Sequence, residues 1–530
     1  MAVTANPNAT EAALEILRLD GNALDAAIAA QAVLNLVEPQ SSGVGGGGFL
    51  LYWDSGRRRL AAWDGRETAP ASTGPDFARG QGGRILSFMD LVASGRSVGV
   101  PGLVPMLEAA HRRDGRLRWE RLFAPAIRLA ENGFEVSPRL HRLLSDDPLL
   151  RGDASARALY YDAAGNALAV GTLLRNPALA ATLRGIAASG SQSIGAGEGA
   201  RRIAEVVQAR GGGLAVTDLA GYRPVERRAV CGRFRQWRIC GMPPPSSGGV
   251  TLLQVLGIYE RVQRTAADPR DIDSLHYFAE AGRLAFADRA RYLGDPDFVA
   301  VPQKPLLDPR YLDQRSRLVD PGRAMGIVPP GDLPSRGARS DGSAPELPAT
   351  THISIVDREG NAVALTSSIE SAFGSRIMVD GYLLNNQLTD FAFDPGRETA
   401  PAANRAAPGK RPLSSMAPTM VFDSRGRLHA ILGSPGGGRI IAYVARSLLG
   451  LLDAGMAPDD VLRLGHIANR NGATEVELGR FAVADMRELR GRGHDLREAE
   501  MTSGLHLIVR RNGQWLGAAD PRREGRAAGD

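Results

Sequence analysis

Residues 349–356 read ATTHISIV, and the character of the chain changes at Thr350. Before it, half of residues 326–349 are Gly, Pro or Ser without periodicity, which is typical of a flexible linker. After it, the apolar and β-branched residues of 350–356 predict a buried strand. A linker that runs directly into a strand headed by threonine is what a self-cleaving precursor requires, although an ordinary linker before an ordinary strand would have the same pattern.

Thr350 has the chemistry for such a reaction. Cleavage of the bond between Ala349 and Thr350 would leave a hydroxyl and a free α-amine on one residue. An α-amine has an ordinary pKa of about 7.7–8.0, so a useful fraction is neutral near physiological pH. The neutral amine can take the hydroxyl proton, which is how an N-terminal threonine is activated as a nucleophile. Thr350 is therefore the candidate nucleophile.

The segment after Thr350 predicts a β-hairpin that turns at Glu359-Gly360. With the turn centred there, Thr350 lies opposite Ile369 and has Ser368 and Glu370 as its immediate neighbours. A hydroxyl and a carboxylate at these positions could assist a nucleophile. They could equally be ordinary polar residues at an exposed hairpin end.

A glycine-rich turn is the second candidate element. Residues 433–439 read GSPGGGR and lie between an expected strand over 429–432 and a helix that starts near Ile440. Backbone N–H groups at such a strand-to-helix turn can hold an anion, and the same geometry suits an oxyanion hole. A tight turn without a catalytic role is the alternative.

The remaining pattern predicts a layered α/β body. The segment that follows the linker is rich in strands and has few helices, so its sheets need helical cover from both halves of the chain. The expected helices cover residues 8–19, 22–38, 250–264, 272–292 and 439–454, and the expected strands include 49–53, a pair within 225–242, and 505–510.

Composition disfavours several classes of function. The 530 residues are 43% hydrophobic and 23% charged, as in ordinary globular proteins. The net charge of +6 comes from scattered basic residues, and aromatics make up only 5%, so nucleic-acid binding is not favoured. No run of 18 apolar residues predicts a membrane span. The localisation is not predicted: the sequence as written has no export signal, which fits a cytoplasmic protein, and a natural start further upstream would fit a periplasmic or secreted one.

Other motifs give weaker signals. Residues 43–48 fit GxGxxG, but the order helix, glycines, strand is the reverse of a dinucleotide fingerprint. Residues 95–99 fit GxSxG without a preceding hydrophobic strand. No HExxH, Walker lysine loop or CxxC motif occurs, so we expect neither a metal nor a cofactor.

Cys231 and Cys240 imply no disulfide framework and leave their own pairing open. We expect His352 to be a packed strand residue.

Ten segments together carry a family resemblance. In chain order they are EPQSSGVGGGGFLLYWD, GRETAP, SVGVPGLV, MPPPSSGGV, AFADRARYLGDPDF, TTHISIVDREGNAVALT, LLNNQLTDF, GKRPLSSMAPTMVF, GSPGGGRII and GAADPRR. Over residues 3–522 the chain resembles the γ-glutamyltransferase (γ-glutamyltranspeptidase) family of N-terminal-nucleophile hydrolases. The joint occurrence of the segments in this order makes the resemblance specific.

The resemblance implies an αββα sandwich and cleavage between Ala349 and Thr350. The products would be a large subunit, 1–349, with a flexible pre-cleavage linker at 325–349, and a small catalytic subunit, 350–530. The two subunits would stay together as a heterodimer and form one αββα body. No cofactor or metal, no nucleic acid and no membrane span are implied.

The resemblance also implies roles for individual residues. Thr350 would be the nucleophile, Ser368 would supply a second hydroxyl where the family commonly has threonine, and Gly436 and Gly437 would form the oxyanion hole. The α-carboxylate of a γ-glutamyl group would be held by Arg66, Ser414 and Ser415, and its α-ammonium by Gln387, Asp390 and Glu370. Glutathione and related γ-glutamyl compounds would be the substrates, and water or an amine would accept the γ-glutamyl group from the Thr350 ester.

Two departures from the family pattern leave alternatives open. Glu370 stands where many members have asparagine, and the segment 391–411 is short and lacks tyrosine. A glutaryl or cephalosporin-type acylase on the same fold is therefore the nearest alternative, and a non-catalytic binding protein with a degenerate site is a more distant one. The physiological substrate and acceptor, the balance of hydrolysis and transpeptidation, and the oligomeric state are not predicted.

Overall fold

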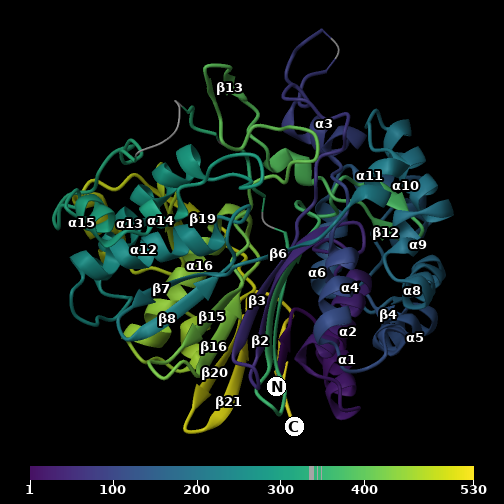
Figure 1. The fold of residues 1–530 in the computed structure, drawn as a ribbon, viewed down its shortest axis with the longest axis horizontal. Coiled ribbons are helices and arrows are strands. Elements are labelled where there is room, and N and C mark those ends of the chain that lie inside the picture. Colours follow the sequence, from purple (N-terminus) through teal and green to yellow (C-terminus); the bar gives the residue numbers. More distant parts are fainter. Residues whose placement is uncertain (81, 334–338, 343, 348) are drawn as a thin grey trace.

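The computed structural model describes residues 1–530 except 81, 334–338, 343 and 348. Figure 1 shows four layers, in which two β-sheets lie face to face and helices cover the outer side of each sheet. The predicted αββα sandwich is confirmed. Part of the linker predicted over 325–349 lies outside the described residues.

The first sheet has seven strands, and each neighbouring pair is antiparallel. Its strands come from both sides of residue 350, so segments that are far apart in the chain lie next to each other in this sheet. Their order is β22 (Arg526–Ala528), β1 (Ala2–Thr4), β9 (Thr351–Val356), β10 (Ala362–Ser368), β2 (Gly47–Asp54), β3 (Arg59–Gly65) and β6 (Val225–Arg227).

The second sheet has six strands and is also antiparallel between neighbours. It too combines segments from the two halves of the chain. Their order is β21 (Gln514–Ala519), β20 (His506–Arg511), β16 (Leu428–Gly433), β15 (Thr419–Phe422), β8 (Trp237–Gly241) and β7 (Val230–Phe234).

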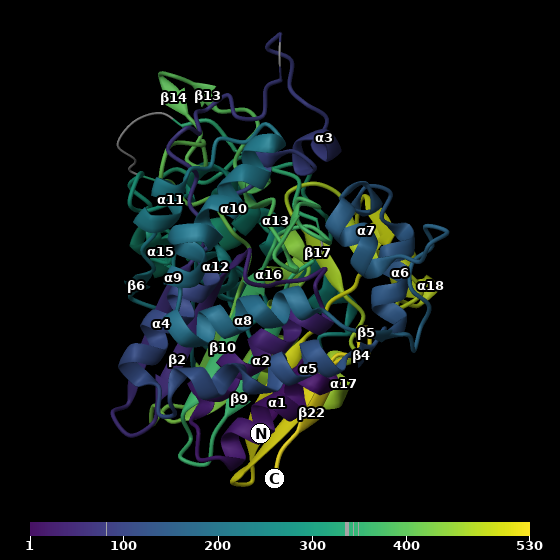
Figure 2. The same cartoon turned by 90° about the vertical axis from the view of Figure 1, so that its right-hand side faces the viewer.

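Two sets of helices form the outer layers (Figures 1 and 2). Beside the first sheet lie α1 (Pro7–Arg18), α2 (Ala23–Val37), α4 (Leu103–Asp114), α5 (Ala124–Asn132), α8 (Pro177–Ser189) and α10 (Gly197–Ala209). Beside the second sheet lie α12 (Gly248–Val262), α13 (Ile272–Tyr292), α15 (Pro309–Ser316) and α16 (Ile440–Leu448), which a π-helical turn extends to Asp453.

Shorter elements complete the fold. The short helices are α3 (Phe88–Val92), α6 (Pro138–Asp146), α7 (Ala154–Tyr160), α9 (Gln192–Gly195), α11 (Val216–Gly221), α14 (Gln303–Leu306), α17 (Pro458–Leu462) and α18 (Val483–Gly491). The short strands are β4 (Phe134–Glu135), β5 (Leu173–Leu174), β11 (Met378–Val379), β12 (Tyr382–Leu383), β13 (Gly396–Arg397), β14 (Ala400–Pro401), β17 (Ile467–Asn469), β18 (Thr474–Glu477) and β19 (Leu496–Ala499).

Strand β2 shows why the sheets have continuous apolar runs. Phe49 and Leu51 pack into the core between the two sheets, whereas Leu50 and Tyr52 pack into the core beneath the helices. A strand with a core on each face has no solvent side, so the alternation of apolar and polar residues disappears. The predicted strand over 49–53 is confirmed within β2.

The long helices begin where the sequence predicts. Asn22 caps α2 by accepting the backbone N–H groups of Leu24 and Asp25, and the Asp25 carboxylate accepts the N–H of Asn22 in return. This reciprocal arrangement satisfies backbone donors that have no partner inside the helix. The helix predicted over 272–292 is confirmed as α13. In the part of the chain that is described, no helix combines the length and apolar character needed to cross a bilayer.

The hairpin after Thr350 differs from the prediction by one residue in register. Thr351 pairs with Ser367, which places Thr350 opposite Ser368 instead of Ile369. The cause is the turn, because the Asp357 N–H donates to Asn361 O and closes a three-residue loop that ends at a glycine with φ +81°. Such loops use a left-handed glycine as their last residue. In the observed register, Ser368 lies directly opposite Thr350, the proposed nucleophile.

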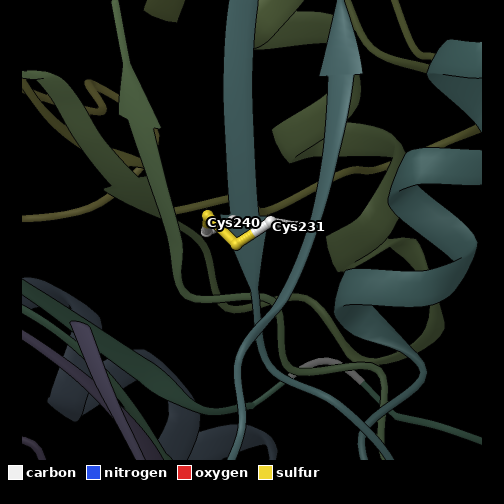
Figure 3. Close-up of a disulfide and its surroundings, with 2 residues drawn as sticks. All are labelled: Cys231 and Cys240. Carbon is white, nitrogen blue, oxygen red and sulfur yellow. A yellow bond between two sulfur atoms is a disulfide. The ribbon is translucent and has the colours of Figure 1, made fainter. Parts of the chain in front are cut away.

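The pairing of the two cysteines, which the sequence leaves open, is decided by the fold. Cys231 on β7 lies opposite Cys240 on β8, and the two form a disulfide (Figure 3).

Candidate active site

Thr350 lies immediately before β9, an interior strand of the first sheet. Its Oγ1 shares a hydrogen bond of 2.9 Å with the Ser368 hydroxyl, and its side chain is buried. The backbone of Thr350 has φ +80°, a left-handed conformation that is unfavourable for a β-branched residue. Glu370, on the neighbouring strand end, is also left-handed, with φ +78°. Strain of this kind is concentrated at functional sites.

Thr350 opens onto a small cavity of about 20 Å³, which is room for about one water molecule. The cavity gathers most of the residues that the sequence singles out, from six separate segments. They are Arg66, Thr350, Ser368, Glu370, Gln387, Asp390, Ser414, Ser415 and Gly437.

The glycine-rich turn after β16 approaches the cavity so closely that side chains are excluded. A Cβ on Gly437 would lie 2.7 Å from Leu347 O, and one on Gly436 would lie 2.5 Å from the Tyr443 ring. Both glycines also have positive φ, +137° at Gly436 and +57° at Gly437. Gly437 lines the cavity and Gly436 directly precedes it. Only glycine fits this turn without strain.

Arg66 and Asp390 form a buried charge pair in the lining of the cavity. Arg66 directly follows β3, and its Nη2 donates to Asp390 Oδ2 at 2.5 Å and to Leu413 O at 2.9 Å. Gln387 also donates to Asp390 Oδ2, at 2.8 Å. Burial raises the pKa of Asp390 to about 6, although Arg66 opposes this change. The pair therefore places a cation and a titratable anion side by side.

Glu370 is the third charged group that the sequence places here. Asn386 donates to its Oε2 at 2.7 Å, and the Leu347 N–H donates to its Oε1 at 3.4 Å. Burial, together with the nearby Asp390 carboxylate, raises the pKa of Glu370 well above its ordinary value. A neutral carboxyl can donate as well as accept a hydrogen bond, whereas an ionised one can only accept.

The comparisons with known proteins decide the family. Residues 9–530 match the family profile described as Gamma-glutamyltranspeptidase. The chain belongs to the gamma-glutamyltranspeptidase family. It is 35% identical to a glutathione hydrolase proenzyme of Bacillus subtilis (strain 168), over all of this chain and 91% of that protein. It is 34% identical to a glutathione hydrolase proenzyme of Escherichia coli (strain K12), over 98% of this chain and 90% of that protein.

A solved family relative has the same fold over its whole length. The crystal structure of a cephalosporin acylase from Bacillus halodurans superposes with a TM-score of 0.87 at 27% identity, covering 99% of this chain and 95% of that one. The family resemblance inferred from the sequence is thus confirmed by the profile match and by the two relatives.

The structure adds residues that the sequence did not single out. Arg289, on α13, donates to the Glu346 carboxylate at 2.7 Å, to Ser247 at 2.8 Å and to Ser415 at 2.9 Å. Glu346 and Leu347 line the cavity, so residues near the end of the linker form part of its wall. Although burial opposes it, Arg289 holds the pKa of Glu346 below its ordinary value. The only feature of the sequence that pointed to Arg289 was the family segment AFADRARYLGDPDF, which contains it.

The remaining predictions concern residues outside the cavity. His352 is fully buried within β9, where Thr366 and Ser354 hydrogen-bond its ring nitrogens, so its reading as a packed strand residue is confirmed. Ser97 of the GxSxG segment lies in a 3₁₀ turn and donates to Val92 O, which does not expose a nucleophile. No group of three or more His, Cys, Asp and Glu side chains among the described residues is arranged to hold a metal ion.

Proposed function

We propose that this protein is an autoprocessed γ-glutamyl hydrolase and transferase that acts on glutathione and related γ-glutamyl compounds. The observation that carries the proposal is one cavity that is lined both by the Thr350–Ser368 hydroxyl pair and by the Arg66–Asp390 charge pair. A γ-glutamyl group has a reactive carbonyl at one end and a zwitterion at the other. The two names reported for relatives, both glutathione hydrolase proenzymes, agree with this substrate class.

Maturation would begin with the Thr350 hydroxyl attacking the Ala349 carbonyl. The C–N bond breaks, the leaving nitrogen takes up the proton that the hydroxyl loses and becomes the free amine, and water hydrolyses the resulting ester. The left-handed φ of Thr350 supports this step, because that torsion is defined by the Ala349 carbonyl carbon and ceases to exist after cleavage. A strained residue of this kind costs about 1–3 kcal/mol, which scission would release.

The products, 349 and 181 residues long (530 − 349), would remain associated. β9 begins at Thr351 and lies between β1 of the large part and β10 of the small part. β10 in turn pairs with β2 through seven residue pairs, from Ala362–Trp53 to Ser368–Gly47. The two chains would share both sheets and both cores, so separating them would expose most of the apolar interior.

Cleavage would also empty the binding pocket. Glu346 and Leu347 occupy it only as long as the linker is tethered to Thr350. Once the new end withdraws, Arg289 would lose its Glu346 partner, and Arg289 and Ser415, which hydrogen-bond each other, would face an open cavity. The uncut chain would therefore be inactive for two reasons, because it has neither a free α-amine nor room for substrate.

Turnover would use both sides of the cavity. Arg66, Ser414 and Ser415 supply donors for the α-carboxylate, and Arg offers carboxylates a two-pronged fork. Asp390, Gln387 and Glu370 would hold the α-ammonium. The Thr350 hydroxyl passes its proton to its own amine and attacks the γ-carbonyl, whose oxygen accepts from the backbone N–H groups of Gly436 and Gly437. The amine leaving group departs with a proton, and water or a second amine then opens the γ-glutamyl ester.

A glutaryl or cephalosporin-type acylase is the second candidate, because a solved cephalosporin acylase has this fold. A glutaryl substrate lacks the α-ammonium and would make no use of Asp390. The buried Arg66–Asp390–Gln387 arrangement therefore favours the γ-glutamyl substrate. Turnover of γ-glutamyl-anilide and glutaryl-anilide by the mature protein separates the two, and preference for glutaryl-anilide would overturn the proposal.

Intact mass spectrometry of the purified protein tests maturation itself. We expect two fragments, and N-terminal sequencing of the smaller one should begin Thr-Thr-His. A single uncut chain without amidase activity would instead favour the binding protein with a degenerate site.

A further inference from the structure

The Thr350 main chain has a charged neighbour from the other end of the chain. Arg523, close to the C-terminal β22, donates from Nη1 to Thr350 O at 3.0 Å and from Nη2 to Thr502 O at 3.2 Å. Its Nε is buried without a partner among the described residues. Both of these hydrogen bonds go to neutral backbone carbonyls. This is unusual for a buried guanidinium beside a proposed nucleophile, because buried arginines normally have a carboxylate partner.

Two carboxylates near Arg523 form ion pairs with other arginines. Glu38 lies 3.7 Å from Arg139, and Asp520 lies 3.2 Å from Arg522. Within the described part of the chain, no carboxylate forms an ion pair with Arg523 itself. Burial lowers the pKa of Arg523 to about 9, so it remains a cation at neutral pH.

We propose that Arg523 is a positioning residue for Thr350: it fixes the nucleophile's main chain and favours the neutral, base-competent form of the new α-amine. This rests on the proposed function, because the amine exists only after cleavage. Distance supports the electrostatic part. Carbonyl oxygen and nitrogen of one residue are three bonds apart, so Nη1, 3.0 Å from Thr350 O, lies within about 7 Å of the amine nitrogen. A like charge at that range disfavours the protonated amine.

Several charged groups face Thr350 and Arg523 and must be included in any account of pH dependence. Negative groups on the pocket side oppose the effect of Arg523, but burial raises the pKa values of Asp390 and Glu370 and so favours their neutral forms. Glu346 would leave with the linker end. These groups are Glu38, Arg139, Tyr443, His506, Asp520 and Glu524 around Arg523, and Arg66, Glu346, Glu370 and Asp390 around the cavity.

Three substitutions separate charge from hydrogen bonding. Arg523→Gln keeps a donor without charge, Arg523→Met removes both, and Arg523→Lys keeps the charge. The measurement is kcat/KM for γ-glutamyl-anilide against pH on mature protein, because its acid limb reports the pKa of the base in the free enzyme. We expect the Gln and Met variants to shift the acid limb upward by about one pH unit, which is about a tenfold loss on the acid side. The Lys variant should keep the original limb.

Arg446 offers a matched control. It is equally buried and donates to two carbonyls, Gly465 O at 2.6 Å and Pro269 O at 2.9 Å, and it likewise has no carboxylate ion pair among the described residues. It lines a different cavity from that of Thr350. We expect Arg446→Met to lower the melting temperature and to leave the acid limb unchanged.

The outcomes are distinct. An unchanged limb in Arg523→Gln, an equal shift in Arg523→Lys, or an equal shift in Arg446→Met would overturn the proposal. So would failure of the Gln variant to mature while the Lys variant matures, since the role would then lie in cleavage and not in the mature base. If the parent protein itself yields no fragment that begins at Thr350, the proposed function fails instead.

Discussion

The two sides of the Thr350 cavity are built in different ways. The nucleophile side consists of Thr350 and Ser368. Strand pairing positions these two residues, because they lie at the paired ends of β9 and β10. The opposite side is assembled from loops, with Arg66 after β3 and Asp390 in a short 3₁₀ turn. It depends on buried charges that satisfy one another.

From this difference we can predict which substitutions affect the chemical step and which affect substrate binding. Backbone hydrogen bonds fix the positions of the two hydroxyls, so replacing either side chain removes a reacting group without moving its neighbours. On the loop side, each charged group is a partner of another, and removal of one leaves a buried charge unmatched. We therefore expect substitutions on the nucleophile side to impair cleavage and turnover together, and those on the loop side to impair substrate binding.

The strongest test is Thr350→Ala. We expect one uncut chain and a loss of amidase activity of about 10⁴-fold or more, because both reactions use the same hydroxyl. Gel electrophoresis and anilide hydrolysis measure the two effects. Thr351→Ala is the matched control, since Thr351 is equally buried and its hydroxyl has no partner among the described residues. Normal cleavage in the Thr350 variant would contradict the assignment.

On the loop side, Arg66→Ala should weaken substrate binding while cleavage proceeds. Two lost charge-assisted hydrogen bonds of about 1.5 kcal/mol each predict a KM about 100-fold higher. Arg283→Ala removes another buried ion pair, with Glu280 at 3.1 Å, and should leave KM unchanged. If the Arg66 variant stays uncut, Arg66 is structural and the comparison of the two sides fails.

Ser368→Ala tests the supporting hydroxyl. Loss of its hydrogen bond to Thr350, worth about 1–1.5 kcal/mol, predicts cleavage and turnover each slower by about tenfold. Single-turnover and steady-state rates measure the effect. Ser368→Thr keeps a hydroxyl and should restore both rates. An effect on KM alone would place Ser368 with the binding side.

The smallest expected effect concerns Glu370 in the uncut Thr350→Ala background. The pKa of Glu370 is raised in the folded state, so the stability that its neutral form contributes is present below about pH 4.5 and is lost as pH rises toward the folded pKa. Glutamine cannot ionise, so adding Glu370→Gln should raise the melting temperature by about 1–2 °C at pH 7 and not at pH 4. A stability gain that is equal at both pH values would show that ionisation is not the cause.

Much of the fold and site follows from local sequence. The linker composition, the strand after Thr350 and the glycine turn 433–439 each have a short-range physical cause, and the family motifs place the pocket residues. The hairpin register was missed by one residue because a single left-handed glycine, Gly360, decides the loop length. Small differences in turn geometry do not change the periodicity of the sequence, so the sequence pattern does not reveal them.

The candidate nucleophile and a layered α/β body could be predicted from local patterns in the sequence, because such patterns act over a few residues. The four-layer architecture was predicted only through the resemblance to the family. Only the tertiary structure decided that Arg289 holds Glu346, that Cys231 pairs with Cys240, and that Arg523 reaches Thr350. Arg289 and Glu346 lie 57 residues apart and Arg523 and Thr350 lie 173 apart. No local pattern encodes such contacts. They exist because two sheets, each drawn from both ends of the chain, bring buried charges together where water no longer competes for them.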